Sequence, residues 1–233
     1  MLSISDYYDG ELIQRLVDEG AHRAVVGWQW DEIGASQLEL LRANGLQRRH
    51  KLLDIGCGSL RGGIHFIRFL EAGNYFGTDL NQSLLDAGYE RELKALDLQG
   101  RLPRANLMCD GSFEFERFGQ AFDFALAYSL FTHLTLNHIR ICLEKLIPAM
   151  KPGATFIATY FEVPDSQPLH RSFLQYRPGG ISHGIEDPYH YRFDDFTWLA
   201  ERHGCTLERV GDFELRRNQK ILKFDMPVRR ANG

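Results

Sequence analysis

The chain has 233 residues, of which 44% are apolar and 25% are charged, and its formal charge at pH 7 is −4. This composition is ordinary for a globular protein that buries a core, organised as one domain with embellishments. No block of Lys and Arg precedes the C-terminal tail, so we expect no nucleic-acid partner. No apolar run reaches membrane-spanning length, so we expect no membrane association.

The cysteines argue against a disulfide framework and against zinc. They lie far apart in apolar contexts, without a C-x-x-C pair, at Cys57, Cys109, Cys142 and Cys205. We therefore expect buried free thiols in a reducing compartment. The N-terminus lacks the basic segment and apolar stretch of a secretory signal. These features predict a cytoplasmic protein.

Residues 1–50 are expected to form an N-terminal helical cap. The apolar spacing predicts helices over 11–19 and 36–44, which end at Gly20 and Gly45 as C-cap glycines. An aromatic cluster, Trp28-Gln29-Trp30, lies between them. Two interpretations stay open for this cluster, which either covers the substrate of a site or packs against the domain.

From residue 51 onward, strand and helix patterns alternate. Strands are predicted over 51–55, 75–78, 105–109, 122–127 and 155–160, and helices over 61–70, 83–97 and 135–150. Asn81 or Ser83 is the expected N-cap of the second helix, and Pro148 is expected to shorten the third. Lys151-Pro152-Gly153 is predicted to form a turn before the fifth strand.

Residues 164–188 break the alternation and contain four of the eight prolines. A helix over 194–203, capped by Asp194, and strands over 206–213 and 221–226 are expected to follow. The pattern predicts an α/β protein with a doubly wound, seven-stranded, mostly parallel sheet over 51–233. An insert at about 162–192 interrupts this domain after the fifth strand.

In doubly wound sheets, ligands bind beyond the carboxyl ends of the strands. The first strand ends at Asp54 and a turn with Gly56 and Gly58, where a backbone without Cβ atoms allows a ligand to approach closely. The second strand ends in Asp79, a suitable acceptor for two ribose hydroxyls. The third ends in Asp110, a suitable acceptor for an adenine amine, and the N–H that follows suits a ring nitrogen.

These motifs occur in the order of a known family. LLDIGCGS, GTDLN, CDGSF, FDFALAYSLFTHL and KPGATFIAT resemble the successive motifs of class I, Rossmann-like S-adenosylmethionine-dependent methyltransferases. The family often has a third glycine where this chain has Leu60. A nicotinamide dinucleotide is the rival ligand, but its fingerprint requires glycine where this chain has Arg61.

The resemblance implies S-adenosylmethionine as cofactor and S-adenosylhomocysteine as product. Its implied cofactor-binding residues are Asp54, Gly56, Cys57 and Gly58 around the methionine part, Asp79 and Leu80 at the ribose, Asp110 and Gly111 at the adenine, and Tyr128 and Ser129 after the fourth strand. The N-terminal helices are expected to cover the cleft, and the insert is expected to form an acceptor lid.

A methyl acceptor that is a hydroxyl needs a general base. His133 lies just past the fourth strand, and His183 and His190 lie in the insert, so these three histidines are the candidate catalytic residues. The alternative for each is an ordinary loop contact. Asp187-Pro188-Tyr189 resembles the Asp-Pro-Pro-Tyr motif of adenine amino-methylating enzymes, but it lies too far downstream and we reject it.

No carboxylate cluster follows the strands on the acceptor side, so no metal is predicted. The expected function is methyl transfer to an oxygen or nitrogen of a small molecule, such as a metabolite, natural product or sugar intermediate. A protein or peptide methyltransferase and a non-catalytic cofactor-binding domain remain alternatives, and a homodimer stays open.

Overall fold

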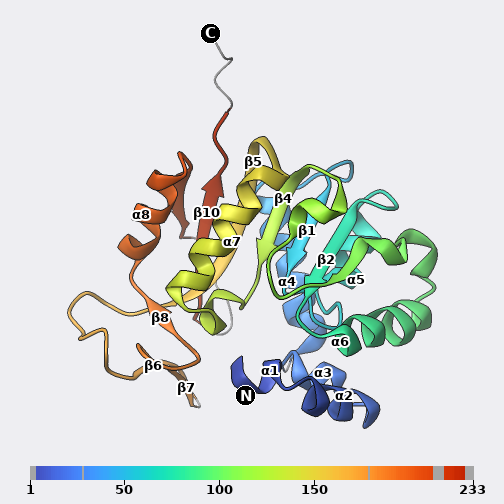
Figure 1. The fold of residues 1–233 in the computed structure, drawn as a ribbon, viewed down its shortest axis with the longest axis horizontal. Helices are drawn as coiled ribbons and strands as arrows, with labels where there is room; N and C mark the ends of the chain where they lie inside the picture. The colour runs from blue at the N-terminus through green and yellow to red at the C-terminus, as the bar shows by residue number, and fades with distance from the viewer. Residues whose placement is uncertain (1–3, 28, 178, 212–217, 229–233) are drawn as a thin grey trace. The chain divides into compact units, whose positions relative to one another are not determined.

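The structure, a computed structural model, describes residues 4–27, 29–177, 179–211 and 218–228 (Figure 1). The chain divides into two compact units, Met1–Ser112 and Phe113–Gly233, and we describe each by itself. Trp28 of the aromatic cluster and residues 212–213 of one predicted strand lie outside the described residues. No helix among the described residues is long and apolar enough to cross a membrane.

The first unit begins with short helices. These are α1 (Ile4–Tyr8), α2 (Gly10–Asp18), α3 (His22–Val25) and α4 (Trp30–Ala43). Gly20 and Gly45 adopt left-handed φ angles of 82° and 99° directly after α2 and α4, as predicted for C-cap glycines. The apolar face of α2, with Ile13 and Val17, packs against Leu84 in a buried cluster, so this segment is part of the unit's core.

Three parallel strands follow, in the spatial order β3-β2-β1. They are β1 (Leu52–Ile55), β2 (Tyr75–Asp79) and β3 (Leu107–Cys109). Every residue of β1 is buried, as expected for a parallel strand that is covered on both faces. Helix α5 (Gly63–Phe69) follows β1, and α6 (Gln82–Ala87) follows β2 and continues as the π-helix η1 (Gly88–Leu93).

The second unit contains the strands β4 (Phe122–Ala127), β5 (Met150–Glu162), β9 (Thr206–Val210) and β10 (Lys220–Asp225), in the order β4-β5-β10-β9. β4 and β5 are parallel, and β10 is antiparallel to both β5 and β9. The connecting helices are α7 (Leu136–Ala149) and α8 (Phe193–Arg202). The predicted α/β class with a mostly parallel sheet is confirmed.

Several local predictions need correction. Pro148 lies inside α7 and does not shorten it. Lys151-Pro152-Gly153 is part of β5, where the pairing with β4 shifts register and Gly153 takes a φ of 72°, so the turn signal marks an irregularity within the strand. Asp194 does not cap α8. Arg192 is the N-cap, and its N–H donates to Asp195 Oδ2 across 2.8 Å.

The insert has secondary structure of its own. β6 (Phe173–Tyr176) and β7 (Gly180–Ser182) pair antiparallel, and β8 (His190–Tyr191) runs parallel to the end of β5. All four cysteines are free, and Cys57, Cys142 and Cys205 are buried. Cys109 is exposed, contrary to prediction, because it ends β3 at the edge of its sheet.

An aromatic core fixes the segment that follows β4. The rings of Phe131 and Phe196 stack at a centroid distance of 6.1 Å, and the Tyr160 ring meets Phe196 edge-on at 4.8 Å. Tyr191 of β8 also meets Phe196 edge-on, at 5.5 Å. The short 3-10 turn η5 (Phe131–His133) is therefore anchored to β5, α8 and β8.

Candidate cofactor and acceptor site

The turn after β1 has the open backbone that a close ligand needs. Gly56 is exposed and has a φ of 74°, and Gly58 has a φ of 54°. The N–H groups of Gly56 and Cys57 both donate to the Thr78 carbonyl of β2, at 2.8 and 3.0 Å. The turn is therefore held against the end of the neighbouring strand.

Asp79 joins the turn to β2 through its side chain. Its Oδ2 accepts a hydrogen bond from the Gly58 N–H at 2.8 Å, and its Oδ1 accepts one from the Asn81 N–H at 3.0 Å. Burial raises the pKa of Asp79, while these N–H groups act in the opposite direction. A carboxylate has about four lone-pair positions, so it keeps acceptor capacity for hydroxyl groups.

Asp110 directly follows β3, the strand next to β2, and lies beside Asp79. Its N–H donates to the Asp79 carbonyl at 2.9 Å, and its Oδ1 accepts from the Ser112 N–H at 2.8 Å. Gly111 is exposed, and a Cβ there would lie 2.7 Å from Cδ1 of Leu80. The structure thus brings the glycine turn, Asp79 and Asp110 together at one edge of the sheet.

Asp54 occupies a different position, beneath the turn. It is 4% exposed, and the Tyr75 hydroxyl donates to its Oδ2 at 2.7 Å. Burial raises the pKa of Asp54 to about 7, although the hydrogen bond from Tyr75 acts to lower it. Cys57 is also buried, and burial raises the pKa of its thiol well above the usual range. The predicted contact of Asp54 with the methionine part stays a prediction.

The N-terminal helices rest on this turn. A Cβ on Gly58 would lie 2.4 Å from Cγ1 of Val26, so this glycine makes room for the cap. Ser59 Oγ donates to the His22 carbonyl at 3.2 Å, and Asn81 Nδ2 donates to the Tyr7 carbonyl at 3.0 Å. No local sequence pattern predicts these contacts, which join residues at least 32 positions apart.

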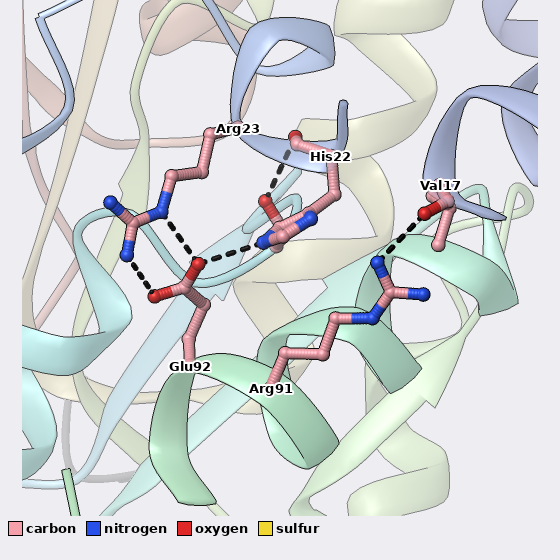
Figure 2. A network of polar contacts seen from close by, with 6 residues as sticks. Val17, His22, Arg23, Arg91 and Glu92 are labelled. Atoms are coloured by element: carbon pink, nitrogen blue, oxygen red, sulfur yellow. Dashed lines mark hydrogen bonds and ion pairs between the residues drawn. The ribbon is translucent and has the colours of Figure 1, made fainter. Parts of the chain in front are cut away.

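A charged cluster strengthens the same attachment (Figure 2). Oε1 of Glu92, in η1, lies 2.7 Å from Nε2 of buried His22. The Glu92 carboxylate also accepts from Nε and Nη2 of Arg23, at 2.7 and 2.6 Å. Burial alone raises the pKa of Glu92, but hydrogen bonds from Arg23 and His22 outweigh it and lower the pKa. The Arg23 guanidinium lies 4.8 Å from the Trp30 ring centroid, a contact that favours the packing interpretation for this part of the aromatic cluster.

The residues that follow β4 belong to the second unit. Ser129 has a φ of 56°, which is uncommon for a residue with a side chain. Its N–H donates to Thr159 Oγ1 at 2.7 Å, and Gln219 Oε1 accepts from both hydroxyls, at 3.0 Å from Ser129 and 2.6 Å from Thr159. Tyr128, before it, is half-buried. No pattern in the sequence indicates Thr159 or Gln219 as partners of Ser129.

His133 is paired with a carboxylate from the insert. Its Nδ1 lies 2.6 Å from Oδ1 of Asp187, and the two side chains are 15% and 4% exposed. The position of Asp187-Pro188-Tyr189 in the sequence argues against an adenine-methylation motif, and no other role is predicted for Asp187. The aspartate lies 54 positions from His133, and no local pattern predicts such a contact.

The two histidines of the insert differ from His133. His190 is 2% exposed, and its ring nitrogens lie 2.9 Å from Ser182 Oγ and 2.9 Å from the Leu169 carbonyl. A neutral imidazole with both nitrogens engaged in this way has no lone pair for a substrate. His183 Nδ1 lies 2.9 Å from Ser172 Oγ and 3.4 Å from Glu186. These contacts favour a structural role, above all for His190.

The strand-end residues fit the expected cofactor. Ribose hydroxyls and an adenine amine are donors, and Asp79 and Asp110 offer carboxylate acceptors at adjacent strand ends. A sulfonium is cationic and suits a site lined by carboxylates. The exposed, left-handed backbone at Gly56 leaves room for a ligand that a Cβ would restrict. The donor set and the open turn therefore both match an adenosyl ligand.

Comparisons with known proteins agree with this arrangement. Residues 53–156 match a family model described as a methyltransferase domain. Magnesium protoporphyrin IX methyltransferase from Synechocystis PCC 6803, crystallised with SAM, has a similar fold (TM-score 0.58, 14% identity), with 84% of this chain and 79% of that chain covered.

Two further structures extend the likeness. The glycopeptide N-methyltransferase MtfA, complexed with S-adenosyl-L-homocysteine, aligns with a TM-score of 0.60 and 16% identity over 83% of this chain and 90% of that one. An O-methyltransferase family protein from Burkholderia thailandensis aligns with a TM-score of 0.62 and 14% identity over 97% of this chain and 63% of that one. Residues 53–156 therefore match a methyltransferase domain, and the chain shares its fold with methyltransferases that were crystallised with S-adenosylmethionine or S-adenosylhomocysteine.

Proposed function

We propose that this methyltransferase transfers the methyl group to an oxygen or nitrogen of a small-molecule acceptor. The cofactor-binding part of this proposal rests on the 2.8 Å hydrogen bond from the Gly58 N–H to Asp79. This bond holds the glycine turn against the carboxylate that lies next to Asp110. The cofactor supplies a methyl group already activated on a sulfonium. The protein's contribution is then to bind and orient the two reactants and to manage the acceptor's proton.

Each strand-end residue has a separate part in this proposal. Asp79 accepts from the ribose hydroxyls, Asp110 accepts from the adenine amine, and the exposed backbone at Gly56 meets the methionine part. The neighbours act on a porphyrin and a glycopeptide, as their names state, and these compounds support a small-molecule acceptor here. The net charge of −4 supports it further, because it disfavours a polyanionic substrate.

His133 is the candidate for handling the acceptor's proton. It is the one of the three proposed histidines whose ring is paired through Nδ1 with a buried carboxylate, whereas His190 is occupied on both nitrogens. His133→Ala is expected to lower turnover by about 100-fold, within the usual contribution of a general base, while S-adenosylhomocysteine affinity stays within twofold. Equal turnover of the two proteins would remove His133 from this role.

A labelling experiment tests the acceptor class. The full chain is incubated with [methyl-14C]-S-adenosylmethionine and, separately, with a metabolite extract, a protein fraction and total RNA. We expect label in the metabolite fraction alone. Label in the protein fraction would favour the alternative of a protein or peptide methyltransferase. Calorimetric binding of S-adenosylhomocysteine without label transfer to any fraction would favour a non-catalytic binding domain.

A further inference from the structure

A basic hollow lies at the amino ends of β1 and β2, within the first unit. Its volume is about 720 Å³, and it is lined by the end of α4, the loop that follows, and the end of α5. Its charged side chains are Arg42, Arg48, Arg49 and Glu71. The glycine turn follows the carboxyl end of β1, which is about 13 Å away along the four residues of that strand. The hollow is therefore separate from the proposed cofactor site.

The loop between α4 and β1 places two consecutive arginines at its corner. The His50 N–H donates to the Gln47 carbonyl at 3.0 Å, so Arg48 and Arg49 are the central residues of a β-turn. The Arg48 carbonyl also accepts from the Glu71 N–H at 2.8 Å, which attaches the turn to the segment before β2. Both arginine side chains are exposed. The structure thus presents two guanidinium groups on a fixed backbone.

The positive charge of the hollow is not neutralised by ion pairs. Elsewhere in the unit, Arg23 pairs with Glu92, and Arg104 pairs with Asp86. Among the residues that the structure describes, the three arginines of the hollow form no such pair. This is unusual in a chain with 31 acidic and 27 basic residues, where carboxylates are plentiful. Three positive charges therefore face the single negative charge of Glu71.

The nearby helix ends do not account for these arginines. A cation near a helix C-terminus can stabilise the last carbonyls. At the end of α5, Arg101 does this by donating from Nε to the Ile67 carbonyl at 2.9 Å and from Nη2 to the Leu70 carbonyl. At the end of α4, Asn44 Nδ2 and the Gly45 N–H donate to carbonyls of the last turn, at 2.9 and 3.0 Å. Each helix end thus has donors of its own.

The hollow also has an apolar side. Leu46 is 4% exposed and Phe69 is half-buried. The Arg42 guanidinium lies 5.4 Å from the Phe69 ring centroid, so the ring orients this charged group. The volume of the hollow is within the range of sites that take small molecules. An anionic small molecule with an apolar or planar part matches this lining.

We propose that the hollow binds a small molecule that carries a diphosphate group. Guanidinium groups match phosphate oxygens through paired N–H donors. Two phosphates together carry a charge of about −3 at pH 7, which balances the three arginines, whereas a single carboxylate leaves two of them unmatched. The diphosphate belongs either to inorganic pyrophosphate or to a larger molecule that places a planar ring beside Arg42. This inference does not depend on the proposed function.

Isothermal calorimetry with inorganic pyrophosphate tests the site. The full chain is first saturated with S-adenosylhomocysteine, which fills the proposed cofactor site, and no divalent cation is added. Arg48→Gln and Arg49→Gln should each weaken pyrophosphate binding by about 10-fold, a common loss for a charged hydrogen bond. Glu71→Gln should strengthen binding, because it removes a repelling charge.

Arg68→Gln is the matched control, since Arg68 is an exposed arginine of α5 that does not line the hollow. It should bind pyrophosphate like the wild type. Absence of binding to the wild type, or equal affinities of Arg48→Gln, Arg49→Gln and Arg68→Gln, would overturn the proposal. If the chain does not bind S-adenosylhomocysteine, the proposed function fails, and the same titration without it still tests the hollow.

Arg49→Lys separates guanidinium recognition from charge alone. Lysine keeps the charge but lacks the planar pair of donors, so it should bind pyrophosphate better than Arg49→Gln and less well than the wild type. The melting temperatures of these exposed variants should stay near that of the wild type, so a change in affinity reports on the site. Wild-type affinity in Arg49→Lys would overturn the recognition of phosphate by paired donors.

Other ligands define the occupant. Inorganic phosphate should bind at least about 10-fold more weakly than pyrophosphate, and equal affinity would overturn the diphosphate assignment. Uridine diphosphate that binds more tightly, with the gain lost in Arg42→Ala, supports a larger molecule, and equal binding supports free pyrophosphate. A single-stranded RNA oligonucleotide should not displace pyrophosphate. RNA that binds through Arg48 more tightly than pyrophosphate would overturn the proposal in favour of a nucleic-acid surface.

Discussion

The backbone N–H of Gly58 donates to Oδ2 of Asp79 across 2.8 Å, and this single bond joins the turn after β1 to the end of β2. The second oxygen of the same carboxylate accepts from the Asn81 N–H. Both oxygens are therefore oriented by backbone groups. A side chain fixed in this way needs little reordering when a ligand arrives, which favours affinity.

Replacing Asp79 by Ala is expected to weaken S-adenosylhomocysteine binding by about 2 kcal/mol, or roughly 30-fold, because two hydrogen bonds to the ribose are lost. Isothermal calorimetry on the full chain measures this change. Asp86→Ala removes an exposed carboxylate from α6, where its partner is Arg104, and should bind like the wild type. An Asp79→Ala dissociation constant equal to that of Asp86→Ala would refute the ribose contact.

Asp54 gives the protein a pH-dependent stability. Its pKa is about 7 in the folded chain, against an ordinary value of 3.8. Between these two pH values the folded state binds a proton that the unfolded state has lost, so stability falls as the pH rises through this range. Each pH unit between the two pKa values corresponds to about 1.4 kcal/mol.

Asp54→Asn should therefore lose less stability than the wild type between pH 5 and pH 8, since an amide does not titrate while it still accepts from Tyr75. Urea unfolding at several pH values measures the effect. Asp18→Asn, an exposed change on α2, is the control and should follow the wild type. If the unfolding free energies of Asp54→Asn and the wild type changed in parallel with pH, this result would contradict the assigned pKa.

The contact between Gly58 and Val26 predicts coupling between the two positions. Gly58→Ala places a Cβ 2.4 Å from Val26 Cγ1 at a φ of 54° and should destabilise the chain. Val26→Ala removes the clashing atom, so the double variant should be less destabilised than the sum of the single ones, by about 1 kcal/mol. Chemical unfolding of the wild type, the two single variants and the double variant completes this double-mutant cycle. Strictly additive changes in unfolding free energy would argue against this packing of the N-terminal helices.

Leu60 is fully buried and has a φ of 68°, a left-handed value that glycine adopts without a steric cost. Leu60→Ala should cost about 2–5 kcal/mol through the cavity it leaves. Leu60→Gly leaves a similar cavity but relieves about 1 kcal/mol of backbone strain, so it should be at least as stable as Leu60→Ala.

The same two substitutions at Leu84, to Ala and to Gly, should give the opposite order of stability. Leu84 is equally buried but lies in α6, where glycine is about 1 kcal/mol less favourable than alanine. Thermal unfolding of the four variants makes the comparison. If glycine is the worse replacement at both positions, the left-handed backbone of Leu60 carries no strain.

The parts of the fold that could be predicted are those with a local cause. β4 has the predicted limits because its apolar run is buried on both sides, and Gly20 and Gly45 end their helices because glycine tolerates the left-handed region. The strand-end carboxylates Asp79 and Asp110 were found because parallel strands place their ends at one edge.

What could not be predicted depends on contacts between distant segments. Nothing near Asp187 indicates His133, and nothing near Gln219 indicates Ser129, since these pairs are 54 and 90 positions apart. The turn signal of Pro152-Gly153 was misread because a strand irregularity uses the same residues as a turn. The sequence predicts Asp194 as the cap of α8 because aspartate is a preferred N-cap residue, whereas in the structure Arg192 is the N-cap and Asp195 supplies the carboxylate that accepts from its N–H.

The insert is attached on both sides of His133, since the Tyr189 N–H donates to the Thr132 carbonyl and the Tyr191 hydroxyl donates to the Leu134 carbonyl. This attachment has a consequence for engineering. A chimera that exchanges residues 162–192 for the corresponding segment of a relative replaces Asp187 and both anchoring tyrosines in one operation. Under the proposed function, such a graft changes the acceptor lid and the surroundings of His133 together, so altered turnover in a chimera is no measure of acceptor fit alone. Keeping residues 187–191 native while varying 162–186 separates the two effects.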